Sequence, residues 1–134
     1  MLVSEPVTPR WTIWAGRILA VPPVLMLIMG GVMKVAGVAA VVRDFGGRFG
    51  FPAGTLTPIG LLELGCTAVF LVPRTTVLGA VLLTGFLGGA AVTHVHAGEY
   101  LVSLAPALLG VFVWGSVYLR EPRLRALLPL RGPG

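Results

Sequence analysis

Residues 77–95 read VLGAVLLTGFLGGAAVTHV, a run that contains no aspartate, glutamate, lysine or arginine. A helix needs roughly 20 mainly apolar residues to cross the hydrocarbon core of a bilayer, which is about 30 Å thick. Backbone groups inside lipid must satisfy their hydrogen bonds within the protein, so a spanning run of this kind is helical. The run therefore predicts a membrane-spanning helix.

Three further apolar runs of similar length lie on either side of this one. The links between the last three runs are short, and short links make neighbouring helices antiparallel. We therefore expect an all-α fold, an integral membrane four-helix bundle. The expected domain covers residues 11–120, between cytoplasmic tails at 1–10 and 121–134, and its spans lie at about 14–36, 56–72, 77–95 and 101–119.

The composition of the whole chain agrees with a membrane protein. Hydrophobic residues make up 56% of the 134 residues and charged residues 11%, whereas soluble domains average about 45–50% apolar and about 25% charged residues. A small soluble domain buries only about two-thirds of the surface that its unfolded chain exposes. Lipid can cover the apolar surface that such a chain would leave outside.

The segment from Val38 to Gly54 differs from the four spans. Apolar residues Val38, Val41, Val42 and Phe45 recur at helical spacing, while arginine, aspartate, several glycines and a proline accompany or follow them. This pattern is typical of a short amphipathic helix at the membrane interface that leads into a turn. We expect such a helix between spans one and two.

The charges predict an orientation rather than a nucleic-acid site. The net charge of +5 comes from scattered arginines beside the spans, which form no basic stripe. With four spans, the side that holds both termini carries seven basic residues and the other side carries three, so both termini are expected in the cytoplasm. The first span lacks a clear cleavage site, and we expect it to be retained in a multi-pass protein of the cell membrane.

Three ionisable side chains are expected at membrane depth, namely those of Lys34, Glu63 and His94. Such groups are costly in lipid and therefore usually functional. One comes from each of three spans, and all three fall in the half away from the termini. We predict them as catalytic or ligand-binding residues, with Thr67 and Gly60 beside Glu63 completing a ligand site. A structural ion pair, in which Glu63 fixes helix packing through Lys34 or His94, is the alternative interpretation.

The histidine and cysteine residues exclude several cofactor classes. His94 and His96 lie two residues apart, so on one helix they point about 200° away from each other and lack metal-pair spacing. The chain holds no other histidine, so we expect no haem and no metal site. Cys66 is the single cysteine, which excludes an intrachain disulfide and a CxxC redox motif.

Several short motifs recur along the chain at positions typical of one family. They are Gly31-Val32-Met33-Lys34, Gly50-Phe51-Pro52, Gly60-Leu61-Leu62-Glu63, Pro73-Arg74 and the run Gly89-Ala90-Ala91-Val92-Thr93-His94. Through these motifs the chain resembles the DoxX-like family of small four-span membrane proteins over roughly residues 11–125. The resemblance implies a four-helix membrane bundle. The family's namesake is similar to a subunit of archaeal thiosulfate:quinone oxidoreductase associated with a quinol oxidase, and other relatives are linked to redox homeostasis.

Three functional hypotheses follow from the residues and the resemblance. The first is a site for a quinone- or lipid-like ligand within a membrane redox system, in which quinone is the one cofactor implied. The second is a stand-alone membrane enzyme that uses acid/base chemistry on a hydrophobic substrate, for example isomerisation, cyclisation or epoxide opening. The third is a non-enzymatic accessory subunit. The expected partners are the lipid bilayer, a hydrophobic small molecule and a partner subunit or second copy, with no nucleic acid.

Overall fold

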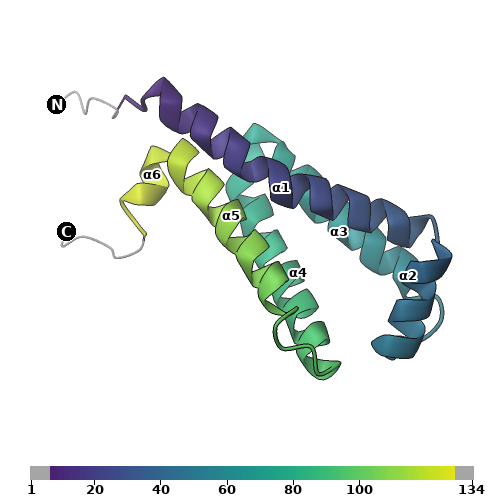
Figure 1. The fold of residues 1–134 in the computed structure, drawn as a ribbon. Coiled ribbons are helices and arrows are strands. Elements are labelled where there is room, and N and C mark those ends of the chain that lie inside the picture. Colours follow the sequence, from purple (N-terminus) through teal and green to yellow (C-terminus); the bar gives the residue numbers. More distant parts are fainter. Residues whose placement is uncertain (1–6, 129–134) are drawn as a thin grey trace.

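A computed structural model describes residues 7–128 of the chain, so residues 1–6 and 129–134 of the expected tails lie outside the described part. Within this part the regular structure is entirely helical (Figure 1). The main helices are α1 (Arg10–Val35), α3 (Leu56–Leu71), α4 (Thr76–His96) and α5 (Leu104–Arg120). The short elements are α2 (Ala39–Arg43), the π-helix η1 (Asp44–Arg48), the 3-10 turn η2 (Pro73–Thr75) and α6 (Pro122–Arg125).

The four main helices pack as a bundle in which α1 and α4 each contact both α3 and α5. This arrangement confirms the predicted all-α bundle, and α2 confirms the helix predicted between the first two main helices. Helix α1 continues without a break through Pro22 and Pro23. Helix α5 begins at Leu104, three residues later than the span expected at 101–119, because residues 97–103 form turns between α4 and α5.

The bundle is tight at one end and open at the other. Figure 1 shows α1 and α3 diverging from α4 and α5 toward the end that carries α2. At the tight end, a Cβ on Gly79 of α4 would lie 2.2 Å from the Cα of Phe70 in α3, so only glycine allows this approach. The fully buried side chains include Phe70, Leu83, Val113 and Val117, which hold this part of the bundle together.

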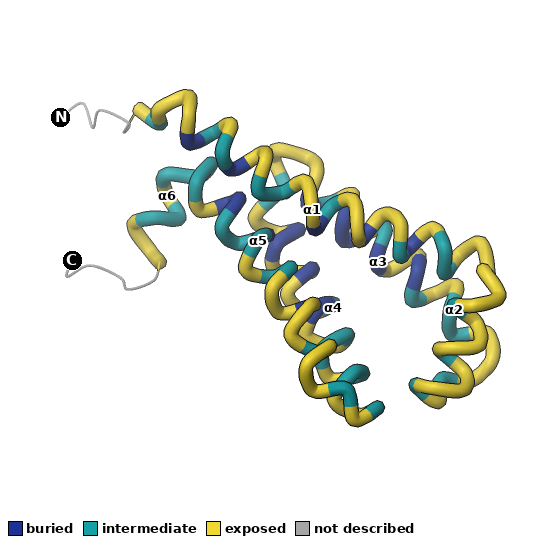
Figure 2. Tube along the Cα trace, viewed as in Figure 1, coloured by how far each residue is buried: buried dark blue, intermediate teal, exposed yellow. Residues whose placement is uncertain are grey.

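The outer surface of the bundle is apolar. Figure 2 shows buried positions on the inner faces of the helices and exposed positions outside. Large hydrophobic side chains are exposed on every main helix, including Ile18, Leu61, Val92 and Val111. Helix α1 and the segment Pro73–His96 are long and apolar enough to cross a membrane, and α3 and α5 are shorter apolar helices. Exposure of so large an apolar surface to water is unfavourable, whereas lipid can cover it.

Candidate functional site

The end of α1 places Lys34 at the open end of the bundle. Gly37 takes a positive φ of 65°, which favours glycine. Its N–H donates to the Lys34 carbonyl at 3.2 Å, and the Val38 N–H donates to the Met33 carbonyl at 3.1 Å. These two bonds form a Schellman motif, which ends α1 at Val35, one residue after Lys34. Lys34 therefore belongs to the last turn of α1 and not to the loop that follows.

Lys34 and Glu63 form an ion pair between α1 and α3. The Lys34 Nζ donates to Glu63 Oε2 at 2.6 Å, and the two side chains are only 14% and 6% exposed. Close packing of the helices allows this contact, because a Cβ on Gly60 would lie 2.9 Å from the Gly31 carbonyl oxygen. Of the two partners proposed for Glu63 from the sequence, the structure selects Lys34.

Lys34, Glu63 and His94 all line one cavity of about 720 Å³ between the diverging helix pairs. The three predicted residues come from α1, α3 and α4, so the fold brings together the groups that the sequence singled out. The remaining walls are mainly aliphatic and aromatic. They include Leu27, Ile59, Leu62, Leu82, Phe86 and Leu109.

The other two predicted ligand residues lie behind this cavity and are not among its lining residues. Thr67 is buried, and its Oγ1 donates to the Glu63 carbonyl at 2.8 Å, one turn away on α3. Gly60 packs against the Lys34 side chain, where an added Cβ would lie 2.8 Å from the Lys34 Cβ. Both residues support the helix that carries Glu63. Cys66, in contrast, does line the cavity.

His94 contacts a carboxylate that was not among the site residues predicted from the sequence. Gly98, with φ of 78°, ends α4 through a second Schellman motif. In this motif the Glu99 N–H donates to the His94 carbonyl at 2.9 Å and the Gly98 N–H to the Val95 carbonyl at 3.0 Å. The chain thereby folds back on α4, and Glu99 Oε2 lies 2.7 Å from His94 Nδ1.

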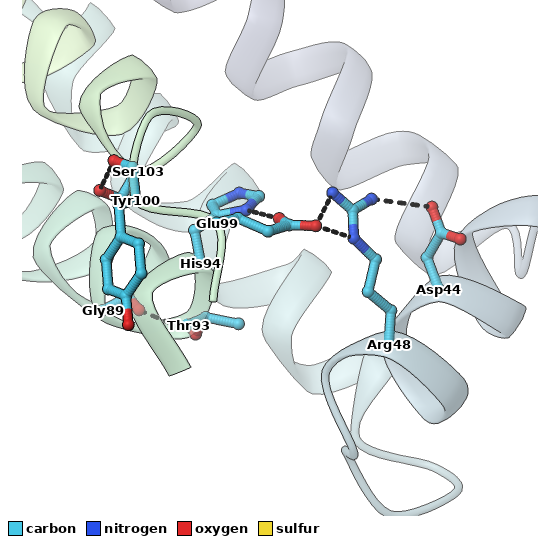
Figure 3. Close-up of polar contacts among 8 residues, drawn as sticks. All are labelled: Asp44, Arg48, Gly89, Thr93, His94, Glu99, Tyr100 and Ser103. Atoms are coloured by element: carbon cyan, nitrogen blue, oxygen red, sulfur yellow. Dashed lines mark hydrogen bonds and ion pairs between the residues drawn. The ribbon is translucent and has the colours of Figure 1, made fainter. Parts of the chain in front are cut away.

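Glu99 also joins the two sides of the open end (Figure 3). Its other oxygen, Oε1, accepts hydrogen bonds from the Arg48 guanidinium at the end of η1. Asp44, one turn earlier in η1, lies 3.9 Å from the same guanidinium. The hydrogen bond with His94 and the contacts with Arg48 outweigh desolvation and lower the pKa of Glu99 below its ordinary value. This chain of contacts ties the α2–η1 segment to the link between α4 and α5.

Three phenylalanines cover the cavity between these charged groups. The ring centroids of Phe45 and Phe49 are 5.5 Å apart, and those of Phe45 and Phe51 are 5.4 Å apart. Phe49 meets the His94 ring edge-on at 5.2 Å, and the Lys34 Nζ lies 5.7 Å from the Phe45 centroid. The site thus joins two charged groups, a histidine and an aromatic wall at one end of an apolar cavity.

A second hollow, of about 670 Å³, lies between α4 and α5 and has a different chemistry. Its lining includes Gly88, Gly110, Trp114 and Tyr118 but no lysine, arginine, histidine, aspartate or glutamate. Within residues 7–128, no group of three histidine, cysteine, aspartate or glutamate side chains is placed to hold a metal ion. The cavity with Lys34 and Glu63 is therefore the candidate site.

Comparison with known proteins assigns the chain to a family. Neither the curated proteins nor the solved structures give a significant match. The family model described as the DoxX-like family matches residues 18–116, a range that contains most of the four main helices and the whole candidate site. With its apolar helices, this match indicates a multi-pass membrane protein. The chain belongs to the DoxX-like family.

Proposed function

We propose that this DoxX-like protein binds a quinone- or lipid-like molecule in the cavity that Lys34, Glu63 and His94 line, and that it serves a membrane redox system. The observation that carries this proposal is the gathering of three ionisable groups at one end of a cavity of about 720 Å³ with apolar walls. Ligand sites commonly combine an apolar cavity of ~300–1,000 Å³ with a few convergent polar groups. The cavity is polar at one end and apolar along its walls, which matches a ligand that has a polar head and an apolar tail.

The polar end of the cavity still has hydrogen-bonding capacity for a ligand. An ammonium group has three N–H donors, and only one of those of Lys34 is used by Glu63. Within the described chain, Glu63 Oε1 accepts no hydrogen bond, and no fully buried side-chain polar atom lacks a partner. Oε1 is therefore open to the cavity. A ligand carbonyl could accept from Lys34, while a ligand hydroxyl could donate to Glu63.

The aromatic wall suits a ring-shaped head group. Phe45 lies beside Lys34 and Phe49 beside His94, and Phe86 lines the cavity from α4. Aromatic rings prefer offset or edge-to-face contacts, which are worth about 0.5–1.5 kcal/mol beyond the area that they bury. A quinone ring can therefore gain from both the phenyl groups and the ion pair, whereas a plain acyl chain gains only from the apolar walls.

A binding titration tests the proposal. We would add a decyl-chain benzoquinone to protein in mild detergent and follow binding by intrinsic tryptophan fluorescence or calorimetry. Binding is expected, with affinity reduced about tenfold or more in Glu63→Gln and Lys34→Met, because each variant removes a charge-assisted hydrogen bond. The matched control is Arg43→Gln, an exposed residue of α2 that does not line the cavity. No binding, or equal binding by all four proteins, would contradict the proposal.

A second candidate function is acid/base catalysis on a hydrophobic substrate, and the His94–Glu99 hydrogen bond of 2.7 Å favours it. A histidine oriented by a carboxylate is a common general base. The two functions differ in the fate of the ligand. We would incubate the protein with its extracted ligand in deuterated water. Deuterium incorporated into carbon–hydrogen bonds, and lost in His94→Gln, would support catalysis, whereas an unchanged ligand would support binding alone.

The proposed orientation places both termini in the cytoplasm of a cell-membrane protein. Among the described residues, the end of the bundle near the termini carries six arginines and one glutamate, while the other end carries three basic and three acidic residues. Cytoplasmic ends of membrane helices carry an excess of lysine and arginine. A green fluorescent protein fused to the C-terminus should therefore fluoresce, whereas a fused alkaline phosphatase should be inactive. The reverse result would contradict this orientation.

A further inference from the structure

The arginine-rich end of the bundle contains an unusually placed arginine, Arg120, which is the last residue of α5. Its stem crosses α1 at Gly16, where an added Cβ would lie 2.6 Å from the Arg120 Cγ. Its Nε donates to the Ser116 carbonyl at 3.1 Å, and its guanidinium carbon lies 5.7 Å from the ring of Phe70 in α3. Three helices thus hold this side chain in one position.

A second arginine lies next to this one. Arg17 is exposed and follows Gly16 on α1, so it lies next to the point where the Arg120 side chain crosses this helix. Its guanidinium carbon stacks 5.3 Å from the ring centroid of Trp14. Among residues 7–128, no carboxylate forms an ion pair with either arginine. Two neighbouring positive charges, one of them half-buried and held in place, therefore lack a protein counterion in the described part.

This arrangement favours the binding of an anion at the membrane interface. Guanidinium groups bind phosphate oxygens through paired N–H donors. The arginines lie at an end of an apolar bundle, where Trp11 and Trp14 are exposed as in the aromatic belt of a membrane interface. The phosphates at that depth belong to lipid head groups, and anionic lipids attract arginines near the membrane surface.

We propose that Arg17 and Arg120 form a binding site for the phosphate of an anionic phospholipid, separate from the cavity at the opposite end of the bundle. The lipid's acyl chains would lie along the exposed apolar residues of α1, such as Ile18 and Val21. Its phosphate would neutralise the two arginines. By occupying the meeting point of α1, α3 and α5, the bound lipid would also stabilise the tight end of the bundle.

Native mass spectrometry of the full chain in mild detergent tests this site. The probe is dioleoyl-phosphatidylglycerol, compared with dioleoyl-phosphatidylcholine. We expect saturable binding of the anionic lipid, with affinity about tenfold weaker in Arg17→Gln and in Arg120→Gln, since each loses a charge-assisted contact. The matched control is Arg74→Gln, which removes an exposed arginine in the turn at the same end and should keep wild-type affinity.

Three results would overturn the proposal. Equal weakening in Arg74→Gln would show diffuse attraction to a positive surface instead of a site. Displacement of the lipid by millimolar inorganic phosphate, with matching thermal stabilisation by phosphate alone, would show a free-phosphate site instead of a lipid site. If Arg120→Gln does not fold, Arg17→Gln decides alone, because Arg17 is exposed. Unchanged lipid affinity in Arg17→Gln then contradicts the proposal.

Discussion

Removing one partner of the Lys34–Glu63 pair should destabilise the bundle far more than removing both. The Nζ–Oε2 distance is 2.6 Å, and the side chains are 14% and 6% exposed. Breaking such a buried pair leaves an uncompensated charge and costs about 3–5 kcal/mol, whereas replacing both partners by apolar groups is close to neutral. We therefore expect Glu63→Gln to lower the free energy of unfolding by about 3 kcal/mol or more. The double variant Lys34→Met/Glu63→Met, in which both partners are replaced by apolar side chains, should recover most of that loss.

Titration with sodium dodecyl sulfate from mild detergent micelles would measure these free energies. Reactivity of the single, buried Cys66 toward a thiol dye gives a signal for unfolding. The matched control is the Asp44–Arg48 pair, whose atoms are 3.9 Å apart and whose side chains are 58% and 43% exposed. Exposed pairs contribute about 0–1 kcal/mol, so Asp44→Asn should change little. Equal effects of Glu63→Gln and Asp44→Asn on the free energy of unfolding would contradict this prediction.

Two further predictions concern packing and pH. Gly79→Ala should destabilise the bundle by about 1–3 kcal/mol in the same titration, because its Cβ would meet the α3 backbone at 2.2 Å. Gly85→Ala, which has open space, should not destabilise it. The contacts of Glu99 lower its pKa, so they should stabilise the α2–η1 segment at neutral pH and be lost as the pH falls through the lowered pKa. Hydrogen exchange of residues 39–48 would be compared between the wild-type protein and Glu99→Gln at each pH. A lack of protection of these residues at pH 7, or equal protection in both proteins, would contradict the prediction.

Much of the fold could be predicted because its signals lie in single segments. Apolar runs mark the four main helices, of which α1 and the segment Pro73–His96 reach spanning length and α3 and α5 are shorter, and helical spacing marks α2. The cost of charge in lipid was enough to single out Lys34, Glu63 and His94, which the structure brings to one cavity. The choice of Lys34 as the partner of Glu63 depends on the close approach of α1 and α3, which no single segment encodes.

The contacts at the open end could not be predicted in the same way. Arg48 and Glu99 are 51 residues apart, and each belongs to a polar link that composition alone assigns to the interface. Gly98 was the available signal, because a glycine just after a helix allows the chain to fold back, and here it brings Glu99 to His94. Thr67 and Gly60 share a helical face with Glu63, yet the packing of α1 places them behind the cavity instead of in its lining.

Photoaffinity mapping would show directly whether a quinone occupies the cavity that Lys34, Glu63 and His94 line. A benzoquinone with a diazirine in its alkyl tail would be irradiated with the purified protein, and the labelled peptides would be identified by mass spectrometry. We expect adducts on cavity residues such as Leu62, Cys66 and Phe86, and these adducts should be reduced by excess unlabelled quinone and by Glu63→Gln. Adducts confined to exposed residues such as Leu25 and Val111, or labelling that excess quinone does not reduce, would contradict the proposal.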